Sequence, residues 1–480
     1  MALMVSVSGI RGLVGQTLTP TVALEFAQAY GTLLGGGRVV LGRDSRPSGP
    51  MFAAAATAGL LATGCQVTEL GLVMTPTVGR AIRDGQYDGG IILTASHNPG
   101  EWNGLKFLDE LGVAPDPARA RRIAEIRAEQ TFRLKPAGFG SIAEDRQAGA
   151  RHMQAVLSAR EVELGAPRGM RVVLDSINGA GCVDTPALLA ALGCEVVHVN
   201  GAPTGQFAHR PEPIRENLAN LCAQVRSSAA AIGFAQDPDA DRLAIVDEHG
   251  EYIGEEYTLA LATQFVLARR PGPVATNLST SRLVDDIAGR YGVKVIRTPV
   301  GESHVARAML ANHCVIGGEG NGGVIDPRIS FVRDSLSAIS LVLQLLATTG
   351  KSVSQLVAEL PRYATIKQKF ELSRERIEPT VKAVTRAFAD RTPNTSDGVR
   401  VDFANGWVHL RASNTEPIVR LIAEARQCRS RQAAPQPGRL SRIRTGKSDH
   451  RRRRGFQADR RLPARDPACR TACSTRRTGS

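Results

Sequence analysis

Three aspartates alternate with other residues in the segment AQDPDADRLAIVDEHG, residues 235–250. In an extended loop this alternation puts the carboxylates of Asp237, Asp239 and Asp241 on one side. Three negative charges so close together repel one another unless a cation lies among them, and oxygen ligands without His or Cys favour Mg²⁺. The segment therefore predicts a magnesium loop with room for a phosphate oxygen. The alternative is an acidic turn on the surface, which the apolar run LAIVD directly after it disfavours.

The segment TASHNPGEWNGLKF, residues 94–107, follows an apolar run that is typical of a buried strand. The end of such a strand faces ligands in α/β sheets, so Ser96 could be a nucleophile, with His97 moving a proton and Lys106 balancing anionic charge. The same residue types are also common in ordinary turns. No esterase-type GxSxG elbow is visible here. A serine that carries a phosphoryl group instead needs a metal and cations, which the aspartate loop and Lys106 would supply.

Two further loops carry groups that suit a phosphorylated ligand. The segment RASNTEP, residues 411–417, offers a guanidinium, hydroxyls and backbone N–H groups that can converge on one phosphate, from Arg411, Ser413, Asn414 and Thr415. The segment GGEGNGG, residues 317–323, carries Glu319 and Asn321 among five glycines, which let a ligand approach closely. Each segment taken alone is more often a turn, so only the combination favours a site.

The elements that must hold these loops follow one repeated pattern. Residues 38–76, 171–203 and 273–301 each run strand, polar loop, amphipathic helix, glycine, strand. Short β-branched runs separated by Ala- and Leu-rich helices indicate α/β domains with parallel sheets covered on both faces. The helices are expected to end at a glycine of positive φ in each repeat, at Gly64, Gly193 and Gly292. The repeat predicts three related α/β domains.

The predicted domains are residues 1–145, 146–255, 256–362 and 363–427, followed by a tail over 428–480. The first three are the repeated units, and the fourth is a smaller α+β domain with an antiparallel hairpin about Asn405 and Gly406. A chain of 480 residues has room for this number of domains. No apolar run long enough to span a bilayer, no leader and no metal-type CxxC pair among the eight cysteines are visible, so we expect a cytoplasmic protein with reduced thiols.

The net charge of +14 is concentrated at the end of the chain. From residue 428 onward there are 16 Arg and Lys against three Asp, which leaves 44 basic and 43 acidic groups in residues 1–427. The body of the protein therefore gives no support to a nucleic-acid partner. The tail has no hydrophobic periodicity and is predicted to be disordered. Two interpretations stay open: a solvated or nucleic-acid-binding tail, or the wrong reading frame of a GC-rich gene.

The four loops, together with SGIRG at 8–12 and GRDSRPSG at 42–49, resemble the α-D-phosphohexomutase family over about residues 5–426. The resemblance implies an α/β fold of three similar mixed-sheet domains plus a smaller C-terminal α+β domain around a central cleft. It also implies a phosphoserine enzyme that interconverts hexose 1-phosphates and 6-phosphates, with Mg²⁺ as cofactor and a hexose 1,6-bisphosphate as activator and intermediate.

By the same resemblance, Ser96 would carry the phosphoryl group and hold Mg²⁺ together with Asp237, Asp239 and Asp241. Arg11, His97, Lys106 and Arg242 would stabilise charge or move protons. Glu319 and Asn321 would bind sugar hydroxyls, and Arg411, Ser413, Asn414 and Thr415 would hold the phosphate that does not react. The expected ligand is a sugar phosphate. The expected oligomeric state is a monomer or homodimer, and no association with a membrane is expected.

The segment TPVGESHVA, residues 298–306, and GEGNGG look most similar to the archaeal-type phosphoglucosamine mutase branch. Glucosamine phosphate is thus the expected substrate, with the phosphomannomutase/phosphoglucomutase branch as the alternative. A metal-dependent sugar phosphatase or phosphate-binding protein is a more distant one. The family continues past RLIAEA into a helix that covers the last sheet. Here the basic tail replaces that helix, so we expect a truncated and less well packed fourth domain.

Overall fold

The computed structural model describes residues 3–162, 169–412 and 418–427, and its strands form four sheets. The first sheet has the order β1-β2-β6-β5-β3-β4-β7 and mixes parallel with antiparallel neighbours. Its strands are β1 (Met4–Ser6), β2 (Gly9–Leu13), β3 (Arg38–Arg43), β4 (Gln66–Leu72), β5 (Gly89–Leu93), β6 (Trp102–Leu108) and β7 (Ile142–Glu144). Its helices are α1 (Pro20–Leu34), α2 (Gly49–Ala62), α3 (Thr75–Gly85) and α4 (Pro117–Glu129).

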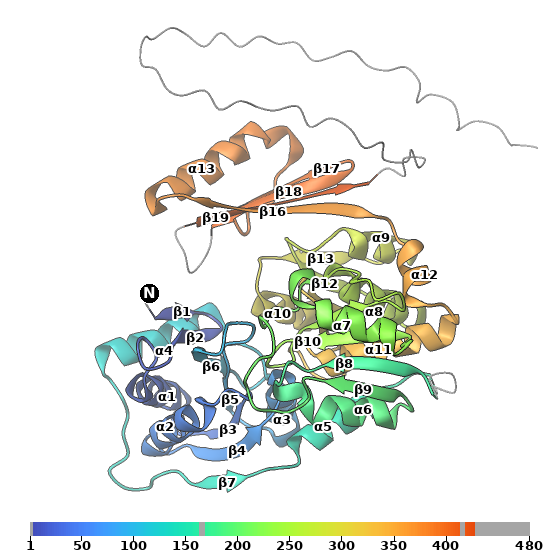
Figure 1. Ribbon diagram of the computed structural model, residues 1–480. Coiled ribbons are helices and arrows are strands. Elements are labelled where there is room, and N and C mark those ends of the chain that lie inside the picture. The colour runs from blue at the N-terminus through green and yellow to red at the C-terminus, as the bar shows by residue number, and fades with distance from the viewer. Residues whose placement is uncertain (1–2, 163–168, 413–417, 428–480) are drawn as a thin grey trace, which may run out of the picture. The chain divides into compact units, whose positions relative to one another are not determined.

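Two hydrophobic clusters cover the two faces of this sheet, because alternate side chains of a strand point to opposite faces. Val39 and Leu41 of β3 pack in the cluster that contains α1, α2 and α4. Val40 between them packs in the cluster that contains α3, on the other face (Figure 1). The prediction of sheets covered on both faces is confirmed for this domain.

The second and third sheets have four strands each. The second contains β8 (Arg171–Asp175), β9 (Glu195–Val199), β10 (Ile232–Gln236) and β11 (Leu243–Val246), with α5 (Ala148–Ser158), α6 (Asp184–Ala191) and α7 (Ala219–Ser227). The third contains β12 (Val274–Asn277), β13 (Val295–Thr298), β14 (Ile316–Glu319) and β15 (Gly323–Ile325). The helices of this region are α8 (Glu256–Arg269), α9 (Leu283–Arg290), α10 (Glu302–Asn312), α11 (Ser335–Thr349) and α12 (Val353–Ala358).

The predicted repeat is present in the sheet topology. The orders β4-β3-β5-β6, β9-β8-β10-β11 and β13-β12-β14-β15 are equivalent, with three parallel strands followed by one antiparallel strand. The helix-ending glycines Gly64, Gly193 and Gly292 have φ of 84°, 83° and 65°, as expected for this position. Because the third and fourth strands of each repeat are antiparallel neighbours, the connection between them is a hairpin. Those three hairpins contain Ser96, the aspartate loop and the GEGNGG segment.

The fourth sheet is fully antiparallel, in the order β16-β19-β18-β17. It contains β16 (Tyr363–Glu371), β17 (Val399–Phe403), β18 (Gly406–Ala412) and β19 (Ile418–Arg426), with α13 (Arg374–Ala387) on one face (Figure 1). The predicted hairpin is present but is placed one residue too late, because Gly406 already pairs with Phe403 and the loop is Ala404–Asn405.

Helix α13 packs against β17 and β18 and leaves the edge strand β16 exposed. Ile366 and Phe370 of that strand are 58% and 47% exposed. These two are the large hydrophobic side chains of the fourth domain that are exposed among the described residues. The predicted tail lies outside the described residues. None of the described helices combines the length and the apolar character needed to cross a bilayer.

Candidate active site

Ser96 lies three residues beyond the end of β5, in a backbone conformation that is uncommon for serine. Its φ is 49°, in the left-handed region, and its N–H donates to the Oγ1 atom of Thr94 at 2.9 Å. The side chain is buried, and the Oγ atom donates to Asp237 Oδ2 at 3.0 Å. This contact joins the loop of the first repeat to the equivalent loop of the second. Strained conformations of this kind concentrate where a side chain must be aimed at a ligand.

Arg46 of the GRDSRPSG segment holds the Ser96 loop by its carbonyl groups. The NH2 group donates to the carbonyls of Ser96 and Asn98 at 2.6 and 2.8 Å, and NH1 donates to the carbonyl of Pro99 at 2.8 Å. The Nε atom donates to Asp44 Oδ2 at 3.0 Å, and neither side chain of this ion pair is exposed. One guanidinium therefore fixes the path of the loop that carries the serine.

We expect Arg46→Met to inactivate the protein by releasing this loop. The substitution leaves three carbonyls without their donor and Asp44 as an unpaired buried carboxylate, which destabilises by about 3–5 kcal/mol. Urea unfolding followed by circular dichroism measures the loss, and turnover should fall at least about a hundredfold because Ser96 is no longer aimed. The half-exposed pair Arg171–Glu195 gives a matched control. Arg171→Met should cost less than about 1 kcal/mol, and an Arg46 variant that is equally benign would contradict the assigned role.

The three aspartates of the second loop are buried, so the alternative of an exposed acidic turn is wrong. Asp237 Oδ1 accepts the backbone N–H groups of Asp241 and Arg242 at 3.1 and 3.0 Å, which closes the loop on itself. Asp239 Oδ2 accepts from the Oγ1 atom of Thr75 at 2.7 Å. Thr75 begins α3, and its N–H also donates to the Asp239 carbonyl at 3.0 Å. The loop is thereby held against the first domain.

Two carboxylate oxygens in this group have no hydrogen-bond partner although they are buried, Asp239 Oδ1 and Asp241 Oδ1. One oxygen from each of the three aspartates lies within 4.8 Å of the others. Burial and the neighbouring carboxylates raise the pKa of Asp237 well above its ordinary value. Unpaired oxygens in an all-carboxylate set are the donors that a hard divalent cation prefers, so these residues fit the magnesium ion that the sequence predicts.

Four of the basic side chains near the group belong to segments that the sequence analysis singled out. Lys106 Nζ donates to Asp239 Oδ2 at 2.6 Å and lies 3.4 Å from Asp241 Oδ2. Burial opposes its charge, but these two carboxylates raise the pKa of Lys106. The Nε atom of Arg242 lies 3.8 Å from Asp241 Oδ1, and Arg11 NH1 donates to the Asn98 side chain at 3.3 Å. These cations can balance a phosphoryl group placed on Ser96.

His97 is the fourth of these side chains and is uncharged. The Arg242 guanidinium, burial and the Arg11 guanidinium lower the pKa of His97 to about 2. Its Nδ1 atom lies 3.4 Å from Ser96 Oγ. A neutral imidazole at this distance can accept or relay a proton at the serine oxygen but adds no positive charge.

Glu319 ends β14 and is fully hydrogen-bonded. Its Oε1 atom accepts from Asn277 Nδ2 at 2.8 Å and from the Gly301 N–H at 3.2 Å. Its Oε2 atom accepts from Arg333 NH1 at 2.6 Å and from Asn321 Nδ2 at 3.3 Å. The predicted sugar-binding pair Glu319 and Asn321 is therefore in contact, and a sugar hydroxyl would take the place of one of these donors.

Arg411 is placed apart from this group in the fourth domain. Its Nε atom donates to Asp397 Oδ2 at 2.9 Å, and the same oxygen accepts the Val300 N–H at 3.0 Å. The other residues predicted to bind the second phosphate, Ser413, Asn414 and Thr415, lie outside the described residues. They belong to the connection between β18 and β19, which is again an antiparallel pair.

Several residues of the site carry no predicted role. Arg46, Asp44 and Glu302 stand in segments that the sequence marked only by resemblance, and Thr75 and Arg333 stand in segments without any motif for this chemistry. Each acts on a partner far away along the chain. The only usable signal was the cluster of charged and polar residues in GRDSRPSG directly after a predicted strand.

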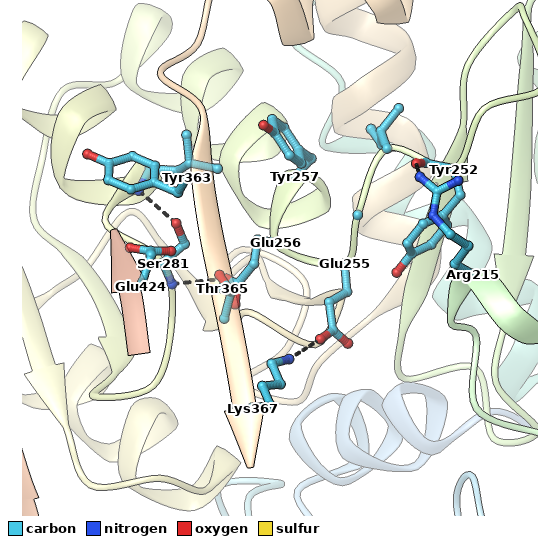
Figure 2. A pocket seen from close by; sticks show the side chains of 13 residues that line it. Arg215, Tyr252, Glu255, Glu256, Tyr257, Ser281, Tyr363, Thr365, Lys367 and Glu424 are labelled. Carbon is cyan, nitrogen blue, oxygen red and sulfur yellow. Dashed lines mark hydrogen bonds and ion pairs between the residues drawn. The ribbon is translucent and has the colours of Figure 1, made fainter. Parts of the chain in front are cut away.

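A cavity of about 470 Å³ lies behind the GEGNGG loop and contains none of the catalytic candidates. Figure 2 shows β16 crossing it, with Lys367 reaching the Glu255 carboxylate to form an ion pair. Glu256 also lines the cavity, and its Oε2 atom accepts the Ser281 N–H at 3.0 Å. A Cβ atom on Gly320 would lie 2.0 Å from the same oxygen, so this glycine lets the loop pack on Glu256. Glu256, which lines the cavity, therefore packs directly against the GEGNGG loop.

We expect Glu256 to make the stability of the protein fall as pH rises. Burial raises the pKa of Glu256 to about 8 from an ordinary 4.5, so between these values the folded protein keeps a proton that the unfolded chain has lost. The free energy of unfolding then decreases with pH across this window. Glu256→Gln removes the ionisation. Thermal melts between about pH 5 and pH 8.5 should show the variant gaining on the wild type as pH rises, and parallel curves would contradict this assignment.

A buried serine, a carboxylate triplet and a set of cations, assembled from equivalent hairpins of repeated domains, define a phosphoryl-transfer site. Sequence models of the phosphoglucomutase/phosphomannomutase domains match the whole body of the chain: domain I over residues 3–134, II over 150–250, III over 254–363 and the C-terminal domain over 369–433. The chain belongs to this family. It is a phosphohexomutase, an isomerase that transfers a phosphoryl group within its substrate.

Relatives of this chain carry names from two branches. A probable phosphoglucosamine mutase of Methanopyrus kandleri is 38% identical over 87% of this chain and 93% of its own length. A phosphoglucomutase/phosphomannomutase of Thermococcus kodakarensis is 40% identical over the same shares. A crystal structure of a phosphoglucomutase/phosphomannomutase family protein from Burkholderia thailandensis covers 88% of this chain and 94% of its own, with a TM-score of 0.78 and 29% identity. The names agree on the reaction class and differ on the sugar.

Proposed function

We propose that the protein interconverts glucosamine 6-phosphate and glucosamine 1-phosphate through a phosphoserine at Ser96 and a bisphosphorylated sugar. The observation that carries the proposal is the buried Ser96 hydroxyl, 3.0 Å from Asp237 in the carboxylate group that also binds Lys106 through Asp239. The sugar rests on the TPVGESHVA and GEGNGG segments and on the names of relatives such as the Methanopyrus protein. The Thermococcus relative supports the alternative that glucose and mannose phosphates are the substrates.

In the proposed first step, a sugar hydroxyl attacks the phosphorus of phosphorylated Ser96. The new oxygen–phosphorus bond forms as the bond to Ser96 Oγ breaks, the sugar hydroxyl gives up its proton, and the serine oxygen gains one. His97 Nδ1 lies 3.4 Å from that oxygen and is within reach for the proton relay. Lys106, Arg242 and Arg11 would balance the charge of the moving group. The bisphosphate then turns, and its other phosphate returns to Ser96.

Asp237, Asp239 and Asp241 would hold Mg²⁺ together with an oxygen of the Ser96 phosphate. A bound Mg²⁺ would polarise the phosphoryl oxygens and offset their negative charge. Glu319 and Asn321 would take sugar hydroxyls, while Arg411 with Ser413, Asn414 and Thr415 would grip the phosphate at the far end. We place the protein in the cytoplasm, as a monomer or homodimer, with domains bounded as the sequence predicts.

Coupled assays test the substrate directly. Glucosamine, glucose and mannose 6-phosphates are supplied separately with Mg²⁺ and catalytic hexose 1,6-bisphosphate, and kcat/KM is compared. The expected order puts glucosamine first. A preference for glucose or mannose phosphate would support the alternative branch. Release of inorganic phosphate without a 1-phosphate product would indicate a phosphatase and overturn the proposal.

A further inference from the structure

Arg333 is a buried side chain that contacts one carboxylate from each of three segments. Its NH2 group donates to Asp241 Oδ2 at 2.6 Å in the metal loop, and its NH1 group donates to Glu319 Oε2 at 2.6 Å in the GEGNGG loop. Its Nε atom lies 3.0 Å from Glu302 Oε2 at the start of α10. Together these carboxylates raise the pKa of Arg333, against the effect of burial. The side chain is therefore a fixed cation.

Backbone contacts on both sides of Arg333 fix the direction of its side chain. Asp334 caps α11 by accepting the N–H groups of the first turn, and its own N–H donates to the Val324 carbonyl of β15 at 2.8 Å. A Cβ atom on Gly323 would lie 2.1 Å from Arg333 Cδ. The arginine stem thus crosses the GEGNGG loop where only glycine leaves room. Gly323 does not have a positive φ, so a glycine is needed here for the space that the Arg333 side chain occupies and not for a left-handed backbone conformation.

The fork of a guanidinium sets the separation of the two oxygens that it binds. One terminal nitrogen holds an oxygen of the metal loop, and the other holds an oxygen of the sugar loop. Asp241 and Glu319 stand in different domains, and Arg333 is the described side chain that hydrogen-bonds to both. Since Asp241 Oδ2 is bound by the arginine, Oδ1, which makes no hydrogen bond, is the oxygen left for the metal.

We propose that Arg333 is a positioning residue. By binding both Glu319 and Asp241, it fixes the position of the hydroxyl-binding carboxylate Glu319 relative to the phosphoryl-transfer centre. The inference rests on the proposed roles of Ser96 and Glu319. Arg333 acts through Glu319 and does not touch the reacting atoms. Arg333 affects turnover through the alignment of the sugar. This alignment is needed twice in one turnover, because each end of the bisphosphate must reach Ser96.

We expect Arg333→Met to lower kcat about a hundredfold, as a misplaced substrate does, while KM for the hexose 6-phosphate rises less than about tenfold. Binding of Mn²⁺, followed by electron paramagnetic resonance with no sugar present, should be no weaker than in the wild type. The variant keeps all three aspartates and loses a nearby positive charge. A tenfold weaker Mn²⁺ site would show that Arg333 maintains the metal loop instead, and would overturn the inference.

Arg328 provides the matched control. It lies five residues earlier and also pairs with two carboxylates, Asp326 at 2.6 Å and Glu161 at 2.8 Å. Arg328→Met should lower the melting temperature but leave kcat and KM within about threefold of the wild type. Equal losses of kcat in the Arg328 and Arg333 variants would mean that any broken ion pair in this region slows turnover, which would overturn the assigned role.

A double-mutant cycle with Glu319→Gln isolates the coupling. If Arg333 acts through Glu319, the double variant is no more than about threefold slower than Glu319→Gln alone. Losses that multiply would overturn the inference, as would a Glu319→Gln variant with wild-type kinetics. A Glu319→Gln variant with wild-type kinetics would not contradict the phosphoserine step. An active Ser96→Ala variant would refute that step, but the coupling between Arg333 and Glu319 could still be measured.

Arg333→Lys keeps the test open if the methionine variant fails to fold. Lysine retains the charge but holds one carboxylate at a time instead of two in a fixed fork. We expect it to fold and to lose kcat about as strongly as Arg333→Met. A wild-type kcat in this variant would overturn the inference, because charge alone would then be sufficient.

Discussion

Replacing Ser96 with alanine is expected to abolish mutase activity, with a loss of at least about ten-thousandfold in kcat. The substitution removes the oxygen that would carry the phosphoryl group, and the hydroxyl of Thr94 in the same loop is not free to replace it. Thr94 Oγ1 accepts the N–H of residue 96 at 2.9 Å and donates to Asp44 at 2.6 Å. Coupled assays with all three hexose 6-phosphates measure the loss, and mass spectrometry of the intact chain detects the phosphate on Ser96.

The variant should fold normally, because the removed hydroxyl makes only two side-chain hydrogen bonds, with Asp237 at 3.0 Å and with His97 at 3.4 Å. Ser45→Ala is a suitable control. Its Oγ donates to the Asn178 carbonyl at 2.8 Å, close to the same loop but outside the carboxylate group. We expect this control to stay within about threefold of wild-type turnover. Full activity of Ser96→Ala would refute the phosphoserine, and loss of phosphate without loss of activity would point to direct transfer between sugars.

The sequence was sufficient to locate the three loops that the structure places at equivalent points of the repeat, because each loop is a local feature. Alternating aspartates, a serine after a strand and glycines around Glu319 are visible in a few residues. The repeat then placed each segment at an equivalent point of a related domain. The topology explains why this succeeded: all three segments are the hairpins between the third and fourth strands. Their meeting needs only that the domains face one another.

The residues that align the loops could not be predicted, because their partners are set by tertiary packing. Arg333 is 92 positions from Asp241, and Arg46 is 50 from Ser96. Nothing in local spacing distinguishes such an arginine from one on a solvated face. The burial of the aspartates was also beyond local reasoning, since it depends on α3 supplying Thr75 from another domain. The one-residue error in the Asn405 hairpin has the same origin, as register depends on pairing across the sheet.

Asp237→Asn is expected to abolish the response to magnesium while making the metal-free protein more stable. The amide oxygen can still accept the N–H groups of Asp241 and Arg242, so the loop keeps its closure. The negative charge disappears from a buried group whose other members, Asp239 and Asp241, repel it. The melting temperature in EDTA should therefore rise. Added Mg²⁺ should no longer raise it, and turnover at saturating Mg²⁺ should fall about a thousandfold.

A variant whose melting temperature in EDTA rises while its turnover falls distinguishes a metal loop from a structural turn. Asp247 is the matched control, because its Oδ1 atom also accepts two backbone N–H groups, of His249 at 3.0 Å and Glu251 at 2.9 Å. Asp247→Asn should leave the Mg²⁺ response unchanged. If Asp237 merely closed a turn, its amide variant would behave like this control. An Asp237→Asn protein that Mg²⁺ stabilises as much as the wild type would place the ion elsewhere and leave the unpaired oxygens of Asp239 and Asp241 without their proposed ligand.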